Sequence, residues 1–205
     1  MLATRLTRYA GRSDVVVLGL PRGGVPVAYE VARALNAPLD VFSVRKLGVP
    51  GREELAMGAI TAGGARVLNE DVLDALAIST GELAAVIERE QSEALRRERL
   101  YRGDRPAPVL GGKTAIVVDD GLATGASMLV AIRALRAYAP AAIVVAVPVA
   151  PAETAALLAR YADDVVAARM PEPFGGVGSW YDDFSQTSDG EVRALLDDGA
   201  ARYVG

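Results

Sequence analysis

The chain has 205 residues, about half of them hydrophobic, and a formal net charge of −4 from 22 basic and 26 acidic residues. It contains no cysteine and no histidine, which excludes disulfides, thiol catalysis, zinc–thiolate sites and imidazole acid–base chemistry. Because no basic excess indicates nucleic-acid binding and no uninterrupted apolar run could cross a membrane, we expect a soluble, cytoplasmic protein of one domain, alone or with an appendage.

The first part of the chain alternates apolar strands with helical patterns. From residue 1 to residue 76 the expected elements are a short helix at 1–10, a strand at 14–20, a helix at 25–35, a strand at 39–44, a loop at 46–54, a hairpin of 57–61 with 65–68, and a short helix at 70–76. The loop at 46–54 is expected because it contains Gly48, Pro50 and Gly51.

A long helix is expected over residues 80–100, with Leu83, Val86, Ile87 and Leu95 as its apolar stripe. Its other face is dense in Glu and Arg, which we interpret as a solvated face rather than as a partner-binding surface. The remaining expected elements are a loop at 103–112, strands at 113–118, 141–147 and 164–168, helices at 126–138 and 152–161, a Gly-, Pro- and aromatic-rich segment at 170–190, and a last helix at 189–196.

This alternation predicts an α/β fold with a central, mostly parallel sheet and helices on both faces. Ligands of such folds bind at the carboxyl ends of the strands. Each candidate site below is expected at such an end.

The most informative run extends from Ile116 to Ser127. A buried strand leads into Asp119-Asp120, whose carboxylates can hold sugar hydroxyls directly or through a divalent cation. The following turn, Thr124 to Ser127, offers backbone N–H groups and hydroxyls to a phosphate at a helix N-terminus. The whole run resembles the binding signature of the type I phosphoribosyltransferases, which use 5-phosphoribosyl 1-diphosphate (PRPP) as the sugar donor.

The resemblance implies the type I phosphoribosyltransferase fold, with a small C-terminal hood that recognises the acceptor. On that basis we expect a core over residues 1–169, with a helical insertion at about 70–102. Residues 170–205 would form the hood, or flap, and the final helix.

A second candidate site is Pro21-Arg22-Gly23-Gly24, at the end of the first apolar strand. Glycines let a backbone approach a ligand closely, and Arg22 adds a positive fork suited to phosphate oxygens. The segment resembles the diphosphate-binding loop of the same family, in which a non-proline cis peptide is common, and we expect one near Arg22–Gly23. The alternative is an ordinary strand-to-helix turn with a solvent-facing arginine.

A third candidate is Arg45-Lys46, which resembles the Arg-Lys segment of adenine- and orotate-type phosphoribosyltransferases. That segment precedes a mobile loop over the active site, and such a lid shields a reaction from water. Lys46 would face the diphosphate and Arg45 would assist. The alternative is that both are exposed loop charges.

In this family diphosphate leaves C1 of the sugar through a transition state with oxocarbenium character. The resemblance therefore implies Mg²⁺ as cofactor, held by Asp119 and Asp120, with catalysis by these two residues, Arg22 and Lys46. The residues expected to bind PRPP are Pro21, Arg22, Gly23, Gly24, Arg45, Lys46, Asp119, Asp120, Gly121, Ala123, Thr124, Gly125, Ala126 and Ser127.

The acceptor is the least constrained part of the prediction. Phe174, Trp180 and Tyr181 are expected to stack on a planar ring, with packing of a C-terminal flap as the alternative. Ala123 stands where hypoxanthine/guanine-type members carry an acidic residue, and Ala-Thr-Gly is similar to the adenine-type motif. We expect an Mg²⁺-dependent transferase that moves phosphoribose from PRPP to a nitrogenous acceptor, with a nucleobase as the favoured class.

The rival interpretation is a non-catalytic PRPP- or nucleotide-binding regulatory protein of the same fold. Lys46 and the lid favour the enzyme. The expected partners are PRPP and a small-molecule acceptor, without nucleic acid or membrane, and the family's frequent homodimers make a second copy of the chain a candidate partner.

Overall fold

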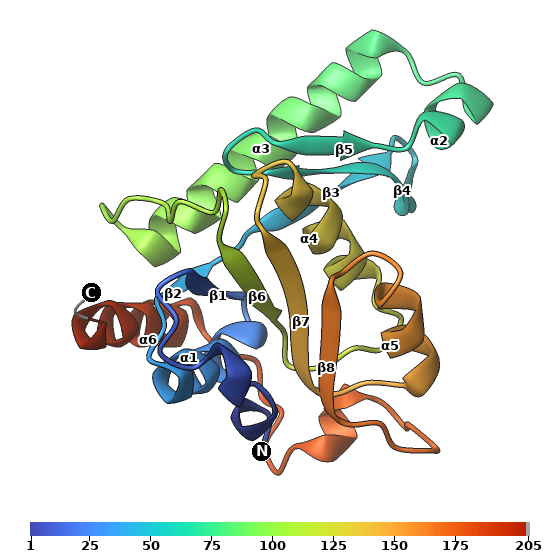
Figure 1. Ribbon diagram of the computed structural model, residues 1–205. Coiled ribbons are helices and arrows are strands. Elements are labelled where there is room, and N and C mark those ends of the chain that lie inside the picture. The colour runs from blue at the N-terminus through green and yellow to red at the C-terminus, as the bar shows by residue number, and fades with distance from the viewer. Residues whose placement is uncertain (204–205) are drawn as a thin grey trace.

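The structure is a computed structural model that describes residues 1–203 (Figure 1). Its centre is a five-stranded sheet in which every neighbouring pair of strands is parallel, in the order β2-β1-β6-β7-β8. The strands are β1 (Val15–Gly19), β2 (Leu39–Val41), β6 (Thr114–Val118), β7 (Ala142–Val149) and β8 (Asp164–Arg169). The predicted α/β fold with a mostly parallel sheet is confirmed.

The central strands are apolar throughout because both of their faces are buried. Val15 and Val17 of β1 belong to one hydrophobic cluster, whereas Val16 and Leu18 belong to another on the opposite face of the sheet. The same alternation holds along β6, so each strand contributes side chains to two cores.

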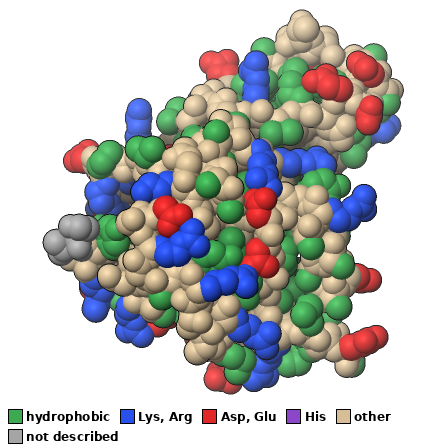
Figure 2. Space-filling model, viewed as in Figure 1, with side chains coloured by type: hydrophobic (Ala, Val, Ile, Leu, Met, Phe, Trp, Pro, Cys, Tyr) green, Lys and Arg blue, Asp and Glu red, His purple; other side chains and the backbone are tan. Residues whose placement is uncertain are grey.

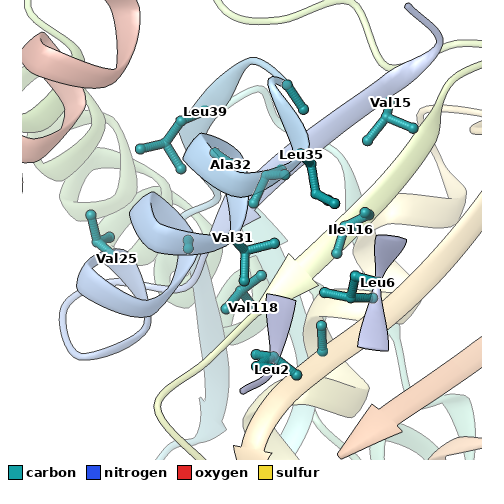
Figure 3. Close-up of a cluster of buried hydrophobic side chains, with 14 of the residues drawn as sticks. Leu2, Leu6, Val15, Val25, Val31, Ala32, Leu35, Leu39, Ile116 and Val118 are labelled. Atoms are coloured by element: carbon teal, nitrogen blue, oxygen red, sulfur yellow. The ribbon is translucent and has the colours of Figure 1, made fainter. Parts of the chain in front are cut away.

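Helices cover both faces of this sheet (Figure 1). On one face lie α1 (Gly24–Leu35) and α6 (Asp189–Arg202), and on the other lie α4 (Ala126–Arg136) and α5 (Ala152–Leu158). Figure 3 shows the first cluster, in which Val31 of α1 lies next to Val118 of β6. Val192 and Leu196 of α6 are also buried in this cluster, so the last helix packs on the core.

A second layer lies to one side of the main sheet. It contains the antiparallel strands β3 (Val44–Val49), β4 (Arg52–Thr61) and β5 (Arg66–Leu68), with α2 (Glu70–Ala75) and α3 (Thr80–Arg102) packed beside them (Figure 1). Leu47, Met57, Ile60, Leu73 and Val86 form its hydrophobic core. Ser79 and Glu82 form a capping box at the start of α3.

The predicted loop at 46–54 is wrong, because these residues belong to β3 and β4. Pro50 and Gly51 make the tight turn between the two strands, where Gly51 has a φ of 72°. The strand pairing is irregular around Gly48, where a Cβ would lie 2.7 Å from the carbonyl oxygen of Glu53. The glycine and proline residues that indicated a loop thus serve a bulge and a hairpin turn.

Other boundaries also differ from the prediction. The strand expected at 39–44 ends at Val41, and the helix expected at 1–10 is two short 3-10 turns, η1 (Ala3–Arg5) and η2 (Thr7–Tyr9), which bury Leu6. Helix α6 continues to Arg202, and Gly199 lets it approach Leu39 of β2 closely.

The charged face of α3 is only partly solvated, which corrects the prediction. Arg102 pairs with Asp40 at 3.0 Å and with Glu98 at 2.7 Å, and all three side chains are largely buried. Burial raises the pKa of Asp40, although the charge of Arg102 opposes the rise. The charges of α3 therefore attach the helix to β2 and to the main sheet.

Residues 170–188 include the 3-10 helix η3 (Val177–Trp180) and cross the carboxyl ends of the strands before α6 returns to the core (Figure 1). We call this segment the hood. Basic and acidic side chains lie interspersed on the face of the molecule that Figure 2 shows. Among residues 1–203, no helix is long and apolar enough to span a membrane.

Candidate active site

The acid pair Asp119-Asp120 directly follows β6, in the middle of the sheet. Gly23 and Gly24, from the turn after the neighbouring strand β1, lie against it. A Cβ at Gly23 would collide with the carboxylate of Asp120, and one at Gly24 would lie 2.6 Å from the carbonyl oxygen of Val118. The structure thus brings the first two predicted motifs together, and both glycines are needed for that contact.

The two carboxylates differ in their surroundings. Burial, followed by the charge of Asp120, raises the pKa of Asp119 to about 7. Burial also raises the pKa of Asp120, whose backbone N–H donates to Asp119 Oδ1 at 3.0 Å. A bound cation would favour the charged form of both groups.

The acid pair fits a hard cation such as Mg²⁺, because two adjacent, partly buried carboxylates offer only oxygen ligands. Within residues 1–203 no group of three or more acidic, histidine or cysteine side chains could hold a metal ion. A Mg²⁺ ion at this place would therefore take most of its ligands from a bound substrate and from water.

The segment after the acid pair leads into α4 as predicted. Gly125 has a φ of 74° and lies beside Thr154, whose hydroxyl donates to the carbonyl oxygen of Ala123 at 2.8 Å. The N-cap residue of α4 is Gly125, which has no side chain to cap the helix. The Ala126 N–H makes only a long contact, 3.4 Å, to the Thr124 hydroxyl. The N-terminus of α4 can therefore accept an anion.

A cavity of about 510 Å³ opens beside Asp119. Pro21, Ala126 and Ser127 line it on the side of the main sheet, and Arg45, Lys46 and Arg97 line it on the side of β3 and α3. We call it the cation-lined cavity. Residues from all three predicted motifs line this cavity.

Arg45 and Lys46 have different partners. The Nη2 atom of Arg45 lies 2.7 Å from Glu90, a buried carboxylate of α3 that also pairs with Arg89. Burial raises the pKa of Glu90, but hydrogen bonds from Arg45 and Arg89 outweigh it and hold the pKa below its usual value. The Nζ atom of Lys46 lies 3.2 Å from the carbonyl oxygen of Glu54 and 3.5 Å from the exposed Glu54 carboxylate. Lys46 is therefore the freer of the two cations.

A second cavity, of about 450 Å³, lies under the hood and opens beside Asp120. Arg22 and Gly23 line it from the β1–α1 turn, and Tyr181, Asp183 and Phe184 line it from the hood. We call it the hood cavity. In the first two motifs adjacent residues thus border different cavities, because Pro21 and Asp119 line the cation-lined cavity.

Tyr181 joins the hood to the acid pair. Its hydroxyl donates to the carbonyl oxygen of Asp120 at 2.6 Å, and its ring centroid lies 5.2 Å from that of Phe184. Burial, followed by the charges of Asp120 and Asp119, raises the pKa of Tyr181. The hydroxyl therefore remains a donor throughout the neutral pH range.

The other two predicted acceptor residues lie elsewhere in the hood. The indole N–H of Trp180 donates to the carbonyl oxygen of Phe174 at 3.0 Å, and neither residue lines the hood cavity. Phe184 lines it instead, together with Gln186 and Thr187. The sequence offers no spacing that separates Phe184 from Phe174, because the hood has almost no regular secondary structure.

Arg22 is on the hood side of the turn and is not among the residues that line the cation-lined cavity with Lys46. Its Nη1 atom lies 3.7 Å from Asp189, which also accepts a hydrogen bond from Tyr101. The non-proline cis peptide is Pro21–Arg22, one residue before the expected position.

Several residues of the cation-lined cavity belong to no sequence motif, among them Ser43 and Arg97. Ser43 lies in the short link between β2 and β3, and Arg97 is one of several arginines on α3. Only the packing of α3 against the β3–β4 layer distinguishes Arg97 from its neighbours.

A family model described as the phosphoribosyl transferase domain matches residues 1–172. The chain belongs to this family. The matched residues contain the acid pair, the β1–α1 turn and the Arg-Lys segment.

Two Mycobacterium tuberculosis proteins, from strains CDC 1551 and H37Rv, are named as candidate phosphoribosyl transferases and are each 49% identical to this chain over 196 residues. The match covers 96% of this chain but 44% of each relative, so the chain spans less than half the length of these curated proteins. The crystal structure of TT1426 from Thermus thermophilus is similar with a TM-score of 0.85 and 42% identity, over 96% of this chain and 93% of that one.

Proposed function

We propose that the protein is an Mg²⁺-dependent phosphoribosyltransferase that moves 5-phosphoribose from PRPP to a nitrogenous acceptor and releases diphosphate. The observation that carries the proposal is the position of the acid pair between two cavities. Asp119 lines the cation-lined cavity, and Asp120 lines the hood cavity.

Displacement at C1 of a sugar needs the acceptor and the leaving group on opposite sides of that carbon. A ribose held over Asp119 and Asp120 would have one cavity on each side. The C1–O bond would break with its electron pair on the diphosphate, while a bond forms from the acceptor nitrogen to C1 and the nitrogen releases its proton to solvent. Enclosure on both sides also limits attack by water.

The phosphate on C5 of the sugar is assigned to the start of α4. The uncapped helix N-terminus after Gly125 and the hydroxyls of Thr124 and Ser127 provide donors for its oxygens. Thr154 and Leu158 of α5 support this turn from behind, which keeps it in place before a ligand binds.

The diphosphate is assigned to the cation-lined cavity, where Lys46 is the freest of the predicted cations. Asp119 and Asp120 would hold the Mg²⁺ ion and orient the ribose hydroxyls. When bound, the ion supplies positive charge that stabilises the developing charge on the leaving group. Arg45 supports this wall through Glu90 rather than as a free ligand.

The acceptor is assigned to the hood cavity. The rings of Tyr181 and Phe184 offer apolar faces to a planar heterocycle, and the carboxylate of Asp183 and the amide of Gln186 offer hydrogen bonds to its edge. A nucleobase has both properties. Nucleic acid and membrane form no part of this proposal, and the cytoplasmic location and the homodimer stay predictions from the sequence.

The test is diphosphate release from PRPP with Mg²⁺ across a panel of purine and pyrimidine bases. The double variant Asp119→Asn with Asp120→Asn serves as the blank, because it keeps the shape of both side chains and removes their charge. Release that depends on one base would support the transferase and name its acceptor. Tight PRPP binding without release for any base would instead support the regulatory alternative.

A further inference from the structure

Arg97 is on α3, outside every motif of the family's binding site, yet it lines the cation-lined cavity with Lys46, Asp119 and Ser127. Its Nε donates to Glu93 at 2.8 Å. In the part of the chain that the structure describes, its two terminal nitrogens have no protein partner within hydrogen-bond distance. Arg97 therefore has its donor fork free for a ligand.

Glu93 holds Arg97 in this orientation. Its carboxylate accepts from both Arg96 and Arg97, and these hydrogen bonds lower the pKa of Glu93 to about 2. The carboxylate thus stays ionised at neutral pH and fixes the Nε end of Arg97, which limits the rotamer freedom that a ligand would otherwise have to remove.

The chemistry of PRPP narrows the choice of ligand group. The start of α4 accounts for the phosphate on C5, and the acid pair accounts for the sugar hydroxyls. The remaining group is the diphosphate, which carries the largest negative charge of the molecule. A guanidinium fork binds two phosphate oxygens at once, whereas the Lys46 ammonium binds as a point charge.

We propose that Arg97 completes the diphosphate subsite, with its guanidinium fork on two phosphate oxygens. This assignment rests on the function proposed above. It gives the helical insertion a role in binding the leaving group, because α3 brings Arg97 into a cavity otherwise lined by residues of the core and of the β3–β4 layer.

The test compares three ligands by calorimetric titration in the presence of Mg²⁺: inorganic diphosphate, PRPP and ribose 5-phosphate. The variants are Arg97→Ala and Arg97→Lys. The matched control is Arg96→Ala, because Arg96 pairs with the same carboxylate but does not line the cavity.

We expect Arg97→Ala to weaken diphosphate and PRPP binding about tenfold or more, and to leave ribose 5-phosphate within about twofold. Arg97→Lys should recover part of the loss, and Arg96→Ala should bind all three ligands like the native protein. Thermal melts of each variant establish that it is folded.

An Arg97→Ala variant that binds diphosphate like the native protein, or that loses ribose 5-phosphate to the same extent, would overturn the assignment while leaving the proposed function standing. Native protein that binds none of the three ligands would instead reject the proposed function itself.

Discussion

Asp119 and Asp120 are neighbours in the chain, yet they border different cavities. The contact with Gly23 and Gly24 depends on the adjacency of β1 and β6 in the sheet, since both pieces emerge at the same edge. Gly23 and Gly24 thus lie so close to the acid pair that neither position has room for a side chain.

The substitution Gly23→Ala tests this contact. The new Cβ would collide with the Asp120 carboxylate, so the carboxylate would have to turn away. We expect PRPP affinity to fall about tenfold or more, with a loss of about 2 kcal/mol in the free energy of unfolding. Titration with PRPP and urea denaturation measure the two effects.

Gly81→Ala is the matched control, because a Cβ there meets nothing within 4 Å and the residue lies in the exposed first turn of α3. It should bind PRPP normally and be slightly more stable. Normal PRPP binding by Gly23→Ala would show that the Asp120 carboxylate is not needed where the structure places it.

Glu93 gives a second prediction at the residue scale, on acid stability. Its pKa is lowered to about 2 by hydrogen bonds from Arg96 and Arg97, so it contributes stability that is present above its unfolded pKa of about 4.5 and lost as the pH falls towards 2. Because the site is near the surface, we expect a contribution of roughly 1 kcal/mol.

Denaturation from pH 5 to pH 2 should therefore show a smaller fall in the free energy of unfolding for Glu93→Gln than for the native protein. Glu88→Gln is the control, because no ion pair of Glu88 is found among the described residues. Parallel curves for the native protein and Glu93→Gln would contradict the prediction.

At the scale of elements, strands whose residues are apolar throughout were predictable. The runs at β1, β6 and β7 are buried on both faces, so hydrophobicity alone marks them. The β3–β4 hairpin was not predictable from the same signal, because Lys46 and Glu54 face solvent and Gly48 interrupts the pairing. Its structure depends on the core that it shares with α3.

Helix α3 was predicted nearly in full, but the role of its charges was not. A pattern of Glu and Arg is the same for a solvated face and for one that pairs with buried carboxylates of other elements. Asp40 and Arg45 decide the difference, and they become neighbours of α3 only in the folded chain. For the same reason the sequence indicated Lys46 but not Arg97.

The pair between Arg102 and Asp40 gives the prediction at this scale. Arg102→Ala would leave Asp40 and Glu98 buried without their cation. We expect a loss of about 3 kcal/mol in the free energy of unfolding, because an uncompensated buried charge is destabilising. Urea denaturation at neutral pH measures it.

The control is Arg89→Ala, which removes a more exposed arginine of the same helix and should cost less than about 1 kcal/mol. Equal losses for the two variants would mean that burial of the Arg102 pair has no energetic consequence.

At the scale of the whole molecule, the hood and the main sheet together form the candidate site. The sequence predicted that the aromatic segment would cover the carboxyl edge, and Tyr181 does reach Asp120. It did not predict which aromatic rings line the cavity, because no helical or strand period orders the hood residues.

Tyr181→Phe tests the connection between hood and sheet. The variant keeps the ring but leaves the carbonyl oxygen of Asp120 without its donor. If the proposed function is correct, we expect kcat/KM for the acceptor to fall about tenfold, with PRPP affinity nearly unchanged. Steady-state kinetics with the acceptor found in the base panel measures the effect.

Trp180→Phe is the control, because Trp180 does not line the hood cavity. Its kcat/KM should match that of the native protein. A larger loss of kcat/KM for Trp180→Phe than for Tyr181→Phe would indicate that the acceptor binds on the Trp180 side of the hood.

A second contact links the hood to the loop that leads to the phosphate turn. Val177 of η3 occupies the space that a side chain at Gly121 would fill, where a Cβ would lie 2.6 Å from Val177 Cγ1. The hood thus packs directly on the loop that precedes the phosphate turn, which connects the two proposed subsites physically. Binding equilibria linked in this way are reciprocal: the factor by which the sugar donor changes the affinity for the acceptor equals the factor by which the acceptor changes the affinity for the donor.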